Sequence, residues 1–168
     1  MAITYDPIAT TTLTSETSTI TFSSIASSWT DLRLVMFGIK PSATSSAPIA
    51  RFNSSSTGYS LCAFWGNGSS VTGDYFDTTQ GGIPLIYFDG LNDTNPKIGI
   101  IDIFSYGGST KKTVLCTESS DRSGSGRIAK AVSMWSNTSA ITSIDVVDGS
   151  GRNFGVGTQV TLYGIKKA

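Results

Sequence analysis

The chain of 168 residues contains no histidine. Histidine is the side chain whose ordinary pKa lies nearest to neutral pH, and it is also a frequent zinc ligand. Its absence removes most Ser-His-Asp triads, zinc sites and proton shuttles from consideration. The sequence therefore predicts a protein that is not an enzyme.

Net charge is lacking as well, because 12 Lys and Arg residues balance 12 Asp and Glu residues. Nucleic acids and anionic membranes attract proteins through clustered basic groups, and a balanced chain offers little of that attraction. No stretch approaches the roughly 20 apolar residues of a membrane-spanning helix, and the N-terminus has neither a basic start nor an apolar run. We expect no nucleic acid partner, no membrane partner, and folding in a cytoplasm.

Cysteine is scarce too, with only Cys62 and Cys116 present. The two positions are far apart, match no CxxC spacing and could form at most one disulfide. We interpret both as small core residues.

What the sequence does contain is abundant serine and threonine around short apolar segments with a period of two, which is typical of β-strands. Turns rich in Gly, Asn and Asp separate these segments. The expected strands are residues 18–22, 32–39, 47–52, 60–65, 84–88, 97–105, 113–117, 128–135, 141–147 and 158–165. About ten strands predict an all-β fold, an antiparallel two-sheet β-sandwich, in one domain spanning residues 1–168. The hydroxyl-bearing residues are expected on its polar outer positions.

The first part of the chain allows two interpretations. Residues 1–12 are a candidate extended arm that crosses to a neighbouring subunit, and an ordinary surface strand is the alternative. Residues 10–21 are nearly all Ser and Thr, but the alternation at 18–22 favours an ordered, exposed β segment over a linker. Residues 27–31 are expected to form a short helical turn or a loop, with Trp29 as a plug.

Motifs that carry chemistry are not evident. Residues 107–112 contain Gly, Ser, Thr and Lys, but the order fails the phosphate-loop pattern and a strand follows, so we predict a β-turn with basic residues at its exit. Asp74, Asp77, Asp89 and Asp93 are interpreted as solvated loop acids, with glycan hydrolysis and calcium binding as weaker alternatives. No Gly-x-Ser-x-Gly elbow occurs. We therefore predict no catalytic residue, no cofactor and no metal.

One aromatic segment is a candidate contact site. Phe64 and Trp65 precede a Gly-rich loop, and Tyr75 and Phe76 follow it. Aromatic faces beside Asn and Asp can hold sugars, and large aromatics are enriched at protein interfaces. The residues proposed to contact a partner or a glycan are Trp65, Asn67, Tyr75, Phe76 and Asp77. The alternative is structural, with Phe64 in the core and Trp65 capping a sheet edge.

The Arg51-Phe52-Asn53 segment is interpreted as conformational rather than as a receptor site. We expect Arg51 to pair with a carboxylate and Asn53 to shape the turn that follows the strand.

Several stretches together resemble a known family. They are Tyr5-Asp6-Pro7-Ile8-Ala9-Thr10-Thr11-Thr12-Leu13, Ile20-Thr21-Phe22-Ser23-Ser24-Ile25, Trp29-Thr30-Asp31-Leu32-Arg33-Leu34, Arg51-Phe52-Asn53 with Gly58-Tyr59-Ser60, Ala140-Ile141-Thr142-Ser143-Ile144, Asn153-Phe154 and Thr161-Leu162-Tyr163-Gly164-Ile165. The set resembles small virion structural proteins of tailed bacteriophages, which are common among phages of aquatic bacteria, including cyanobacteria. The likeness spans nearly the whole chain.

This resemblance implies a jelly-roll sandwich displayed on the virion and made in the host bacterial cytoplasm, with no catalytic residues to carry over. Its partners would be other virion proteins, either the major capsid protein or tail components, and homo-oligomers, often trimers, are common among such sandwiches. In other members an acidic loop follows Arg-Phe-Asn. Here that loop is Ser54-Ser55-Ser56-Thr57, which argues against a metal at this position.

Two functions follow from the resemblance, and a third stands apart from it. The first is a capsid decoration or cement protein, because the chain contains no fibre shaft, heptad or collagen-like repeat. The second is a tail-tip or fibre-associated module that binds a host surface glycan, which the aromatic segment between Trp65 and Asp77 suggests. The third is a hydrolase or carbohydrate-binding sandwich unrelated to phages, for which Asp74 and Asp77 are the candidate acids.

Overall fold

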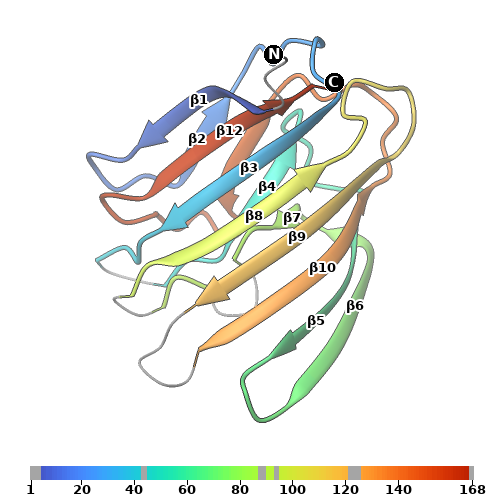
Figure 1. Cartoon of the computed structure of the whole chain (residues 1–168). Helices are drawn as coiled ribbons and strands as arrows, with labels where there is room; N and C mark the ends of the chain where they lie inside the picture. The colour runs from blue at the N-terminus through green and yellow to red at the C-terminus, as the bar shows by residue number, and fades with distance from the viewer. Residues whose placement is uncertain (1–4, 43–44, 87–89, 93–94, 121–125, 167–168) are drawn as a thin grey trace.

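A computed structural model of the chain describes residues 5–42, 45–86, 90–92, 95–120 and 126–166, and for residues 76–80 it describes the strand without the side chains. Twelve strands are present in this part of the chain, and no helix (Figure 1). They are β1 (Tyr5–Thr12), β2 (Thr19–Phe22), β3 (Asp31–Gly38), β4 (Pro48–Phe52), β5 (Tyr59–Gly66), β6 (Val71–Gln80), β7 (Ile83–Pro84), β8 (Lys97–Ile103), β9 (Lys112–Ser120), β10 (Arg127–Trp135), β11 (Ile144–Asp148) and β12 (Gln159–Ile165).

The strands form two sheets, which confirms the all-β sandwich predicted from the sequence. The large sheet has eight strands in the order β1-β12-β3-β8-β9-β10-β5-β6, and the small sheet has four in the order β2-β11-β4-β7. In the large sheet, each strand pairs antiparallel with the next one in this order, from β1 at the edge as far as β5. All pairs of the small sheet are antiparallel as well. The large sheet thus has an inner face, covered by the small sheet, and an outer face directed away from it (Figure 1).

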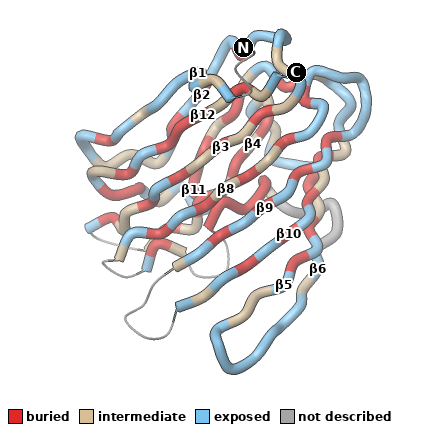
Figure 2. The backbone as a smooth tube through the Cα atoms, in the orientation of Figure 1, coloured by how far each residue is buried: buried red, intermediate tan, exposed pale blue. Residues whose placement is uncertain are grey.

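The core lies between the two sheets because one side of each strand is apolar. Strand β3 shows this alternation, with Leu32, Leu34 and Met36 fully buried and the residues between them partly exposed. The buried positions of β4, β8 and β9 alternate in a similar way, and buried residues of these strands, of β11 and of β12 join the same hydrophobic cluster (Figure 2). A period of two places every second side chain on one face, so these segments could be recognised from the sequence alone.

Three aromatic rings fill one end of this core. Phe52 packs edge-on against Tyr59 and Trp135, with ring centroids 5.9 Å and 5.6 Å away, and Tyr59 stacks on Trp135 at 6.1 Å. The Tyr59 hydroxyl accepts a hydrogen bond from the Phe52 amide at 2.7 Å and donates one to the Ser55 carbonyl at 3.2 Å. Burial raises the pKa of Tyr59 to about 12. These contacts link the small sheet, through Phe52 on β4, to β5 and β10 of the large sheet.

Two glycines allow close approaches that a side chain would prevent. A Cβ atom on Gly99 would lie 2.2 Å from the Leu85 carbonyl oxygen, and one on Gly164 would lie 2.1 Å from the Trp29 ring. Trp29 therefore packs directly over β12, in the plug position expected from the sequence. The segment around it, residues 27–30, is a turn rather than a helix.

The structure corrects two expectations about strand positions. The segment after Trp65, expected to be a Gly-rich loop, is only a tight turn, closed by a hydrogen bond from the Asn67 amide to the Ser70 carbonyl, and strand β6 follows it. Asp74 therefore belongs to a strand and not to a loop. At the other end of the sheet, residues 5–12 form edge strand β1 rather than a free arm, so the surface-strand alternative holds for them.

Candidate functional site

The outer face of the large sheet is the most distinctive surface of the described molecule. On β9, Val114 and Cys116 point into the core while Leu115 and Thr117 point outward, and β10 and β5 alternate in register with β9. The outward positions include large apolar side chains, which we call the apolar face: Phe37, Phe64, Ile98, Leu115, Ile128 and Val132, each 40% to 69% exposed. This finding differs from the sequence expectation, which placed mainly hydroxyl groups on the outer positions.

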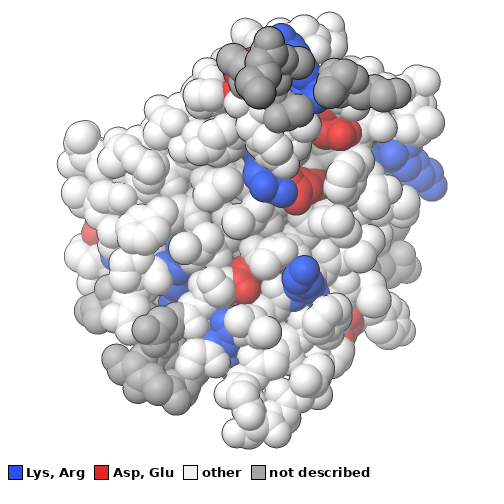
Figure 3. All heavy atoms as spheres, in the orientation of Figure 1, with Lys and Arg blue, Asp and Glu red and all other residues white. Residues whose placement is uncertain are grey.

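Cross-strand pairing brings the members of the apolar face together. Phe37 on β3 lies opposite Ile98 on β8, and Leu115 on β9 lies opposite Val132 on β10. Opposed side chains on one face of a sheet are about 5 Å apart, so the members of each pair are in reach of each other, while Ser119 and Thr117 on β9 lie between the two pairs. The face is seen from outside in Figure 3, where charged side chains are few and scattered among uncharged atoms.

An ion pair lies on the same face. Arg33 and Asp102 are directly opposite each other on β3 and β8. The Arg33 Nε donates to the Asp102 Oδ1 at 2.6 Å and its Nη2 donates to Oδ2 at 2.9 Å. The hydrogen bond to Asp102 raises the pKa of Arg33. The Arg33 guanidinium also lies 5.3 Å from the centre of the Tyr5 ring, a cation–π contact with edge strand β1.

The outer face is hollowed on both sides of Phe64. A hollow of about 520 Å³ is lined by Arg33, Asp102, Leu115, Val132, Cys62 and Phe64, among others. A second, of about 350 Å³, is lined by Phe64 together with Val71, Ser119 and Ile128. Both hollows include Lys130, which forms no ion pair with any residue that the structure describes. Apart from the paired ions and Lys130, their walls are mainly apolar, which suits contact with another apolar surface.

The structure separates the residues that the sequence grouped as a contact site. Trp65 is half-buried and lies opposite Ala129, whose side chain faces inward, so Trp65 and Phe64 point to opposite sides of β5. The Asn67 Oδ1 accepts hydrogen bonds from the Ser69 and Ser70 amides, which makes Asn67 a turn residue.

Of the remaining candidates, Tyr75 is 79% exposed and lines a third hollow, of about 410 Å³, with Cys62 and Val132. The side chains of Phe76 and Asp77 lie outside the described residues. Of the aromatic side chains described in this segment, Phe64 and Tyr75 therefore share the outer face, whereas Trp65 does not. Strand alternation at 64 and 65 could have indicated this division.

The two cysteines also differ, contrary to the expectation that both are core residues. Cys116 is buried, and burial raises its pKa to about 12. Cys62 is exposed on the outer face, opposite Val132. Both cysteines are free thiols. Cys62 lies between the buried residues Leu61 and Ala63, so the alternation of β5 directs it outward.

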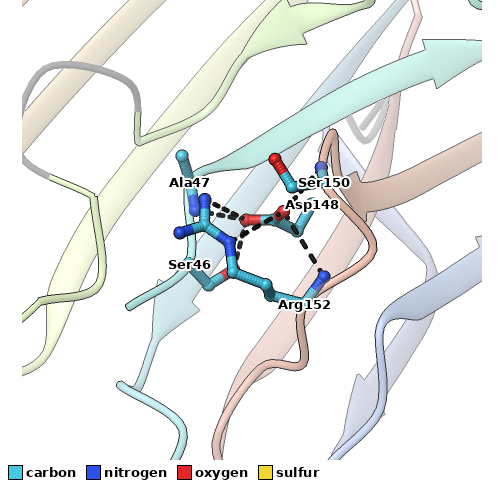
Figure 4. Close-up of polar contacts among 5 residues, drawn as sticks. All are labelled: Ser46, Ala47, Asp148, Ser150 and Arg152. Atoms are coloured by element: carbon cyan, nitrogen blue, oxygen red, sulfur yellow. Dashed lines mark hydrogen bonds and ion pairs between the residues drawn. The ribbon is translucent and has the colours of Figure 1, made fainter. Parts of the chain in front are cut away.

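Asp148 is buried and has a shifted pKa, as catalytic acids often do, but all its contacts hold the fold together. Asp148 on β11 has no exposed side-chain surface. Its oxygens accept hydrogen bonds from the Ala47 amide at 2.7 Å, the Ser46 hydroxyl at 3.1 Å and the Ser150 amide at 2.7 Å, and Arg152 pairs with it at 3.2 Å (Figure 4). Burial alone would raise the pKa of Asp148, but these bonds outweigh it and the pKa is lowered. Asp148 stays ionised and joins two loops.

Sequence reasoning missed two lysines that are buried completely, Lys97 and Lys112. The Lys112 Nζ donates to the carbonyls of Gly108 at 2.6 Å and Thr110 at 2.5 Å, within the turn that precedes β9. Burial lowers the pKa of Lys112. The turn predicted for residues 107–112 is confirmed, and its last lysine closes the turn instead of pointing toward a ligand.

Asn53 shapes its turn as expected. Its φ is 50°, in the left-handed region that Asn tolerates better than most residues. The side chain donates to the Ala140 carbonyl at 2.8 Å and accepts from the amides of Thr142 at 2.8 Å and Ser143 at 3.2 Å. Arg51 donates to the Gly81 carbonyl at 2.8 Å, and among the described residues it does not pair with a carboxylate as the sequence predicted.

The fold and the outer face define an all-β sandwich with an exposed apolar sheet. No protein-family model matches the chain, and neither a curated protein nor a solved structure does. In the described part of the chain, no three Cys, Asp or Glu side chains gather as a metal site requires. A helix long and apolar enough to cross a membrane is also not found among those residues.

Proposed function

We propose that the chain is a non-enzymatic structural protein of a tailed-bacteriophage virion, and that the outer face of its large sheet is an assembly surface. The observation that supports this function is the apolar face, which adds to the resemblance of the sequence to small virion proteins. Exposed apolar patches of this kind on otherwise polar proteins mark sites of protein–protein contact. Within the virion, capsid decoration is the specific role we propose.

The apolar face suits assembly for energetic reasons. Burying apolar area stabilises a contact by about 25 cal/mol per Å², before the costs of association are subtracted. A lone charge in such a contact would be expensive to desolvate, but Arg33 and Asp102 already satisfy each other through two hydrogen bonds. The ion pair can therefore be covered at a lower cost than either charge alone.

Several finer features belong to the same proposal. They are the jelly-roll connectivity that the resemblance implies, location on the virion after synthesis in the host bacterial cytoplasm, and assembly with the major capsid protein or tail components. None of these needs a cofactor, a metal, nucleic acid or a membrane. The polar residues outside the apolar face are the surface that such a protein would present to water.

The copy number in purified particles tests this function. Quantitative mass spectrometry of purified virions should find the chain in numbers comparable to those of the major capsid protein. A few copies per particle would place it in the tail instead. Absence from particles of a phage that expresses the gene would refute the virion role.

A second candidate function, binding of a host surface glycan by a tail-tip module, is favoured by the exposed rings of Phe64 and Tyr75. Each ring lines a hollow that also contains Cys62 and Val132. Aromatic faces bind the apolar sides of sugar rings, and Arg33 and Asp102 could supply hydrogen bonds. Labelled protein should then bind host cells or lipopolysaccharide, and Tyr75→Ala should abolish that binding. No binding at millimolar glycan would rule out this alternative.

A further inference from the structure

We propose that the partner on the outer face is a second copy of this chain. Two large sheets would pack face to face about a twofold axis, with Phe64 of each copy in the hollow of the other. The inference rests on the proposed function, in which the outer face is an assembly surface, and it names the partner. Three properties of the face support it: its area, its shape and its charges.

The area approaches what a stable dimer needs. Strands β3, β8, β9, β10 and β5 are adjacent and contain 7 to 9 residues each. With about 4.8 Å between strands and about 3.4 Å per residue, they cover roughly 24 Å by 27 Å, or about 650 Å² in projection. Side-chain relief increases the accessible area above this value. A standard interface buries about 800 Å² on each partner, so one outer face supplies most of the required surface.

The shape is self-complementary. In a twofold interface the same patch meets itself, so a protrusion and a hollow must lie on one face. Phe64 is 55% exposed and stands at the rim of the 520 Å³ hollow. An axis that passes beside Phe64 would place each ring in the hollow of the other copy, against Leu115 and Val132. Sheets that pack face to face interdigitate in this way, as the inner faces of sandwiches do.

The charges favour the same arrangement. Arg33 and Asp102 neutralise each other within one copy, so two identical faces would not repel through these groups. Lys130 lines the same hollow as Asp102 and has no ion-pair partner among the described residues. Its four-carbon stem can lie along the apolar surface and keep the ammonium group in water at the edge of the interface, so Lys130 need not be buried when the hollow is covered. Of the described residues, the only charges buried in the contact are then those that already pair within one copy.

Sedimentation equilibrium of the full chain over a range from micromolar to millimolar protein tests this inference. The wild-type protein should reach twice the chain mass of 17.7 kDa. Val132→Lys should weaken association at least about tenfold, because an ammonium group would be buried against an apolar surface. The matched control is Val156→Lys, which changes a valine of nearly equal exposure, 54% against 53%, in the loop between β11 and β12. The control should still dimerise.

A second measurement applies if Val132→Lys does not fold. Phe64→Ser removes the protrusion without adding charge and should also yield monomers. In addition, alkylation of Cys62 in the wild-type protein should slow as the protein concentration rises. In Val132→Lys and in Phe64→Ser it should stay fast at every concentration. A monomer at all concentrations, a trimer, or equal loss of association in Val156→Lys would overturn the inference.

These outcomes are separate from those for the virion role. A protein that is monomeric in solution but abundant in particles would refute the dimer and leave the proposed function intact. A protein that dimerises in solution but is missing from purified particles would refute the virion role and leave the dimer intact.

Discussion

The guanidinium of Arg33 meets the carboxylate of Asp102 through two parallel hydrogen bonds between neighbouring strands, on a sheet face that is otherwise mainly apolar. The side chains keep 35% and 22% of their exposure. Solvent therefore screens the pair in the isolated chain, whereas a covering partner would remove that screening. The same two residues can thus contribute little to folding and more to assembly.

A double-mutant cycle separates these contributions. Arg33→Ala, Asp102→Ala and the double variant should give a coupling free energy of unfolding of about 0.5 kcal/mol, as is usual for exposed pairs. Chemical denaturation of dilute protein measures this value. A coupling above about 2 kcal/mol would show that the pair is a main determinant of folding, contrary to its exposure.

Asp148 should behave in the opposite way, because its carboxylate is buried and fully hydrogen-bonded. Asp148→Asn replaces one acceptor oxygen with an amide donor that faces other donors. We expect a loss of about 2 to 4 kcal/mol in the free energy of unfolding at neutral pH. Urea denaturation checks it, with Asp6→Asn as the same exchange at a partly exposed position of edge strand β1, which should change stability little.

The pH dependence gives the same residue a second test. Since the pKa of Asp148 is lowered from 3.8 in the folded state, its stabilisation is complete above the unfolded pKa and is lost as pH falls through the folded pKa. Wild-type stability should therefore drop below about pH 4, and Asp148→Asn should flatten this drop. Glu16, whose pKa is lowered by the Ser42 amide, should leave a smaller residual slope. If the stability of Asp148→Asn fell below pH 4 as steeply as that of the wild type, the loss could not be assigned to Asp148.

The strands were predictable where one face is buried and the other is not. Leu32, Leu34 and Met36 alternate with partly exposed residues, and that pattern requires no knowledge of neighbours. Strand β6 was not predictable in this way, because Gly73 and Asp74 are typical of loops and their strand is held at the sheet edge by β5. Pairing with β5, rather than local preference, determines that segment.

The apolar face was hidden from the sequence for a related reason. Leu115, Ile128 and Val132 lie in segments that were recognised as strands, but apolar residues occur on both of their faces. Periodicity then cannot tell which side faces the core. Likewise, the approach of Arg33 to Asp102 depends on the pairing of β3 with β8, which a single sequence does not reveal.

The two thiols should differ in reactivity. Cys62 is exposed, while Cys116 is buried and its pKa is raised to about 12, so it has almost no thiolate at pH 8. Dilute folded protein should therefore react with one equivalent of a thiol reagent, and denatured protein with two. Mass spectrometry of digested protein identifies the labelled position. Cys62→Ser should abolish native labelling, and Cys116→Ser should leave it unchanged; rapid labelling of Cys116 would contradict its burial.

Gly99 should be intolerant of a side chain. A Cβ atom there would meet the backbone carbonyl of Leu85 at 2.2 Å, and backbone cannot rotate away as a side chain can. Gly99→Ala should destabilise the fold by about 1 to 3 kcal/mol through overpacking. Gly107→Ala is the matched control, because nothing lies within 4 Å of its added Cβ, and it should cost less than about 0.5 kcal/mol. Equal melting temperatures for the two variants would show that Leu85 can move aside.

Asn53 offers a way to separate backbone strain from hydrogen bonding at one position. Asn53→Gly keeps the left-handed φ of 50° accessible but removes the bonds to Ala140, Thr142 and Ser143. Asn53→Ala removes the same bonds but keeps the steric cost of a Cβ in that conformation, about 1 kcal/mol, which the glycine variant relieves. Both variants should lose stability in urea denaturation, and the alanine variant should lose about 1 kcal/mol more than the glycine variant. If the two variants were equally stable, the turn would have relaxed to a negative φ in the alanine variant, and the loss common to both variants would measure the side-chain hydrogen bonds alone.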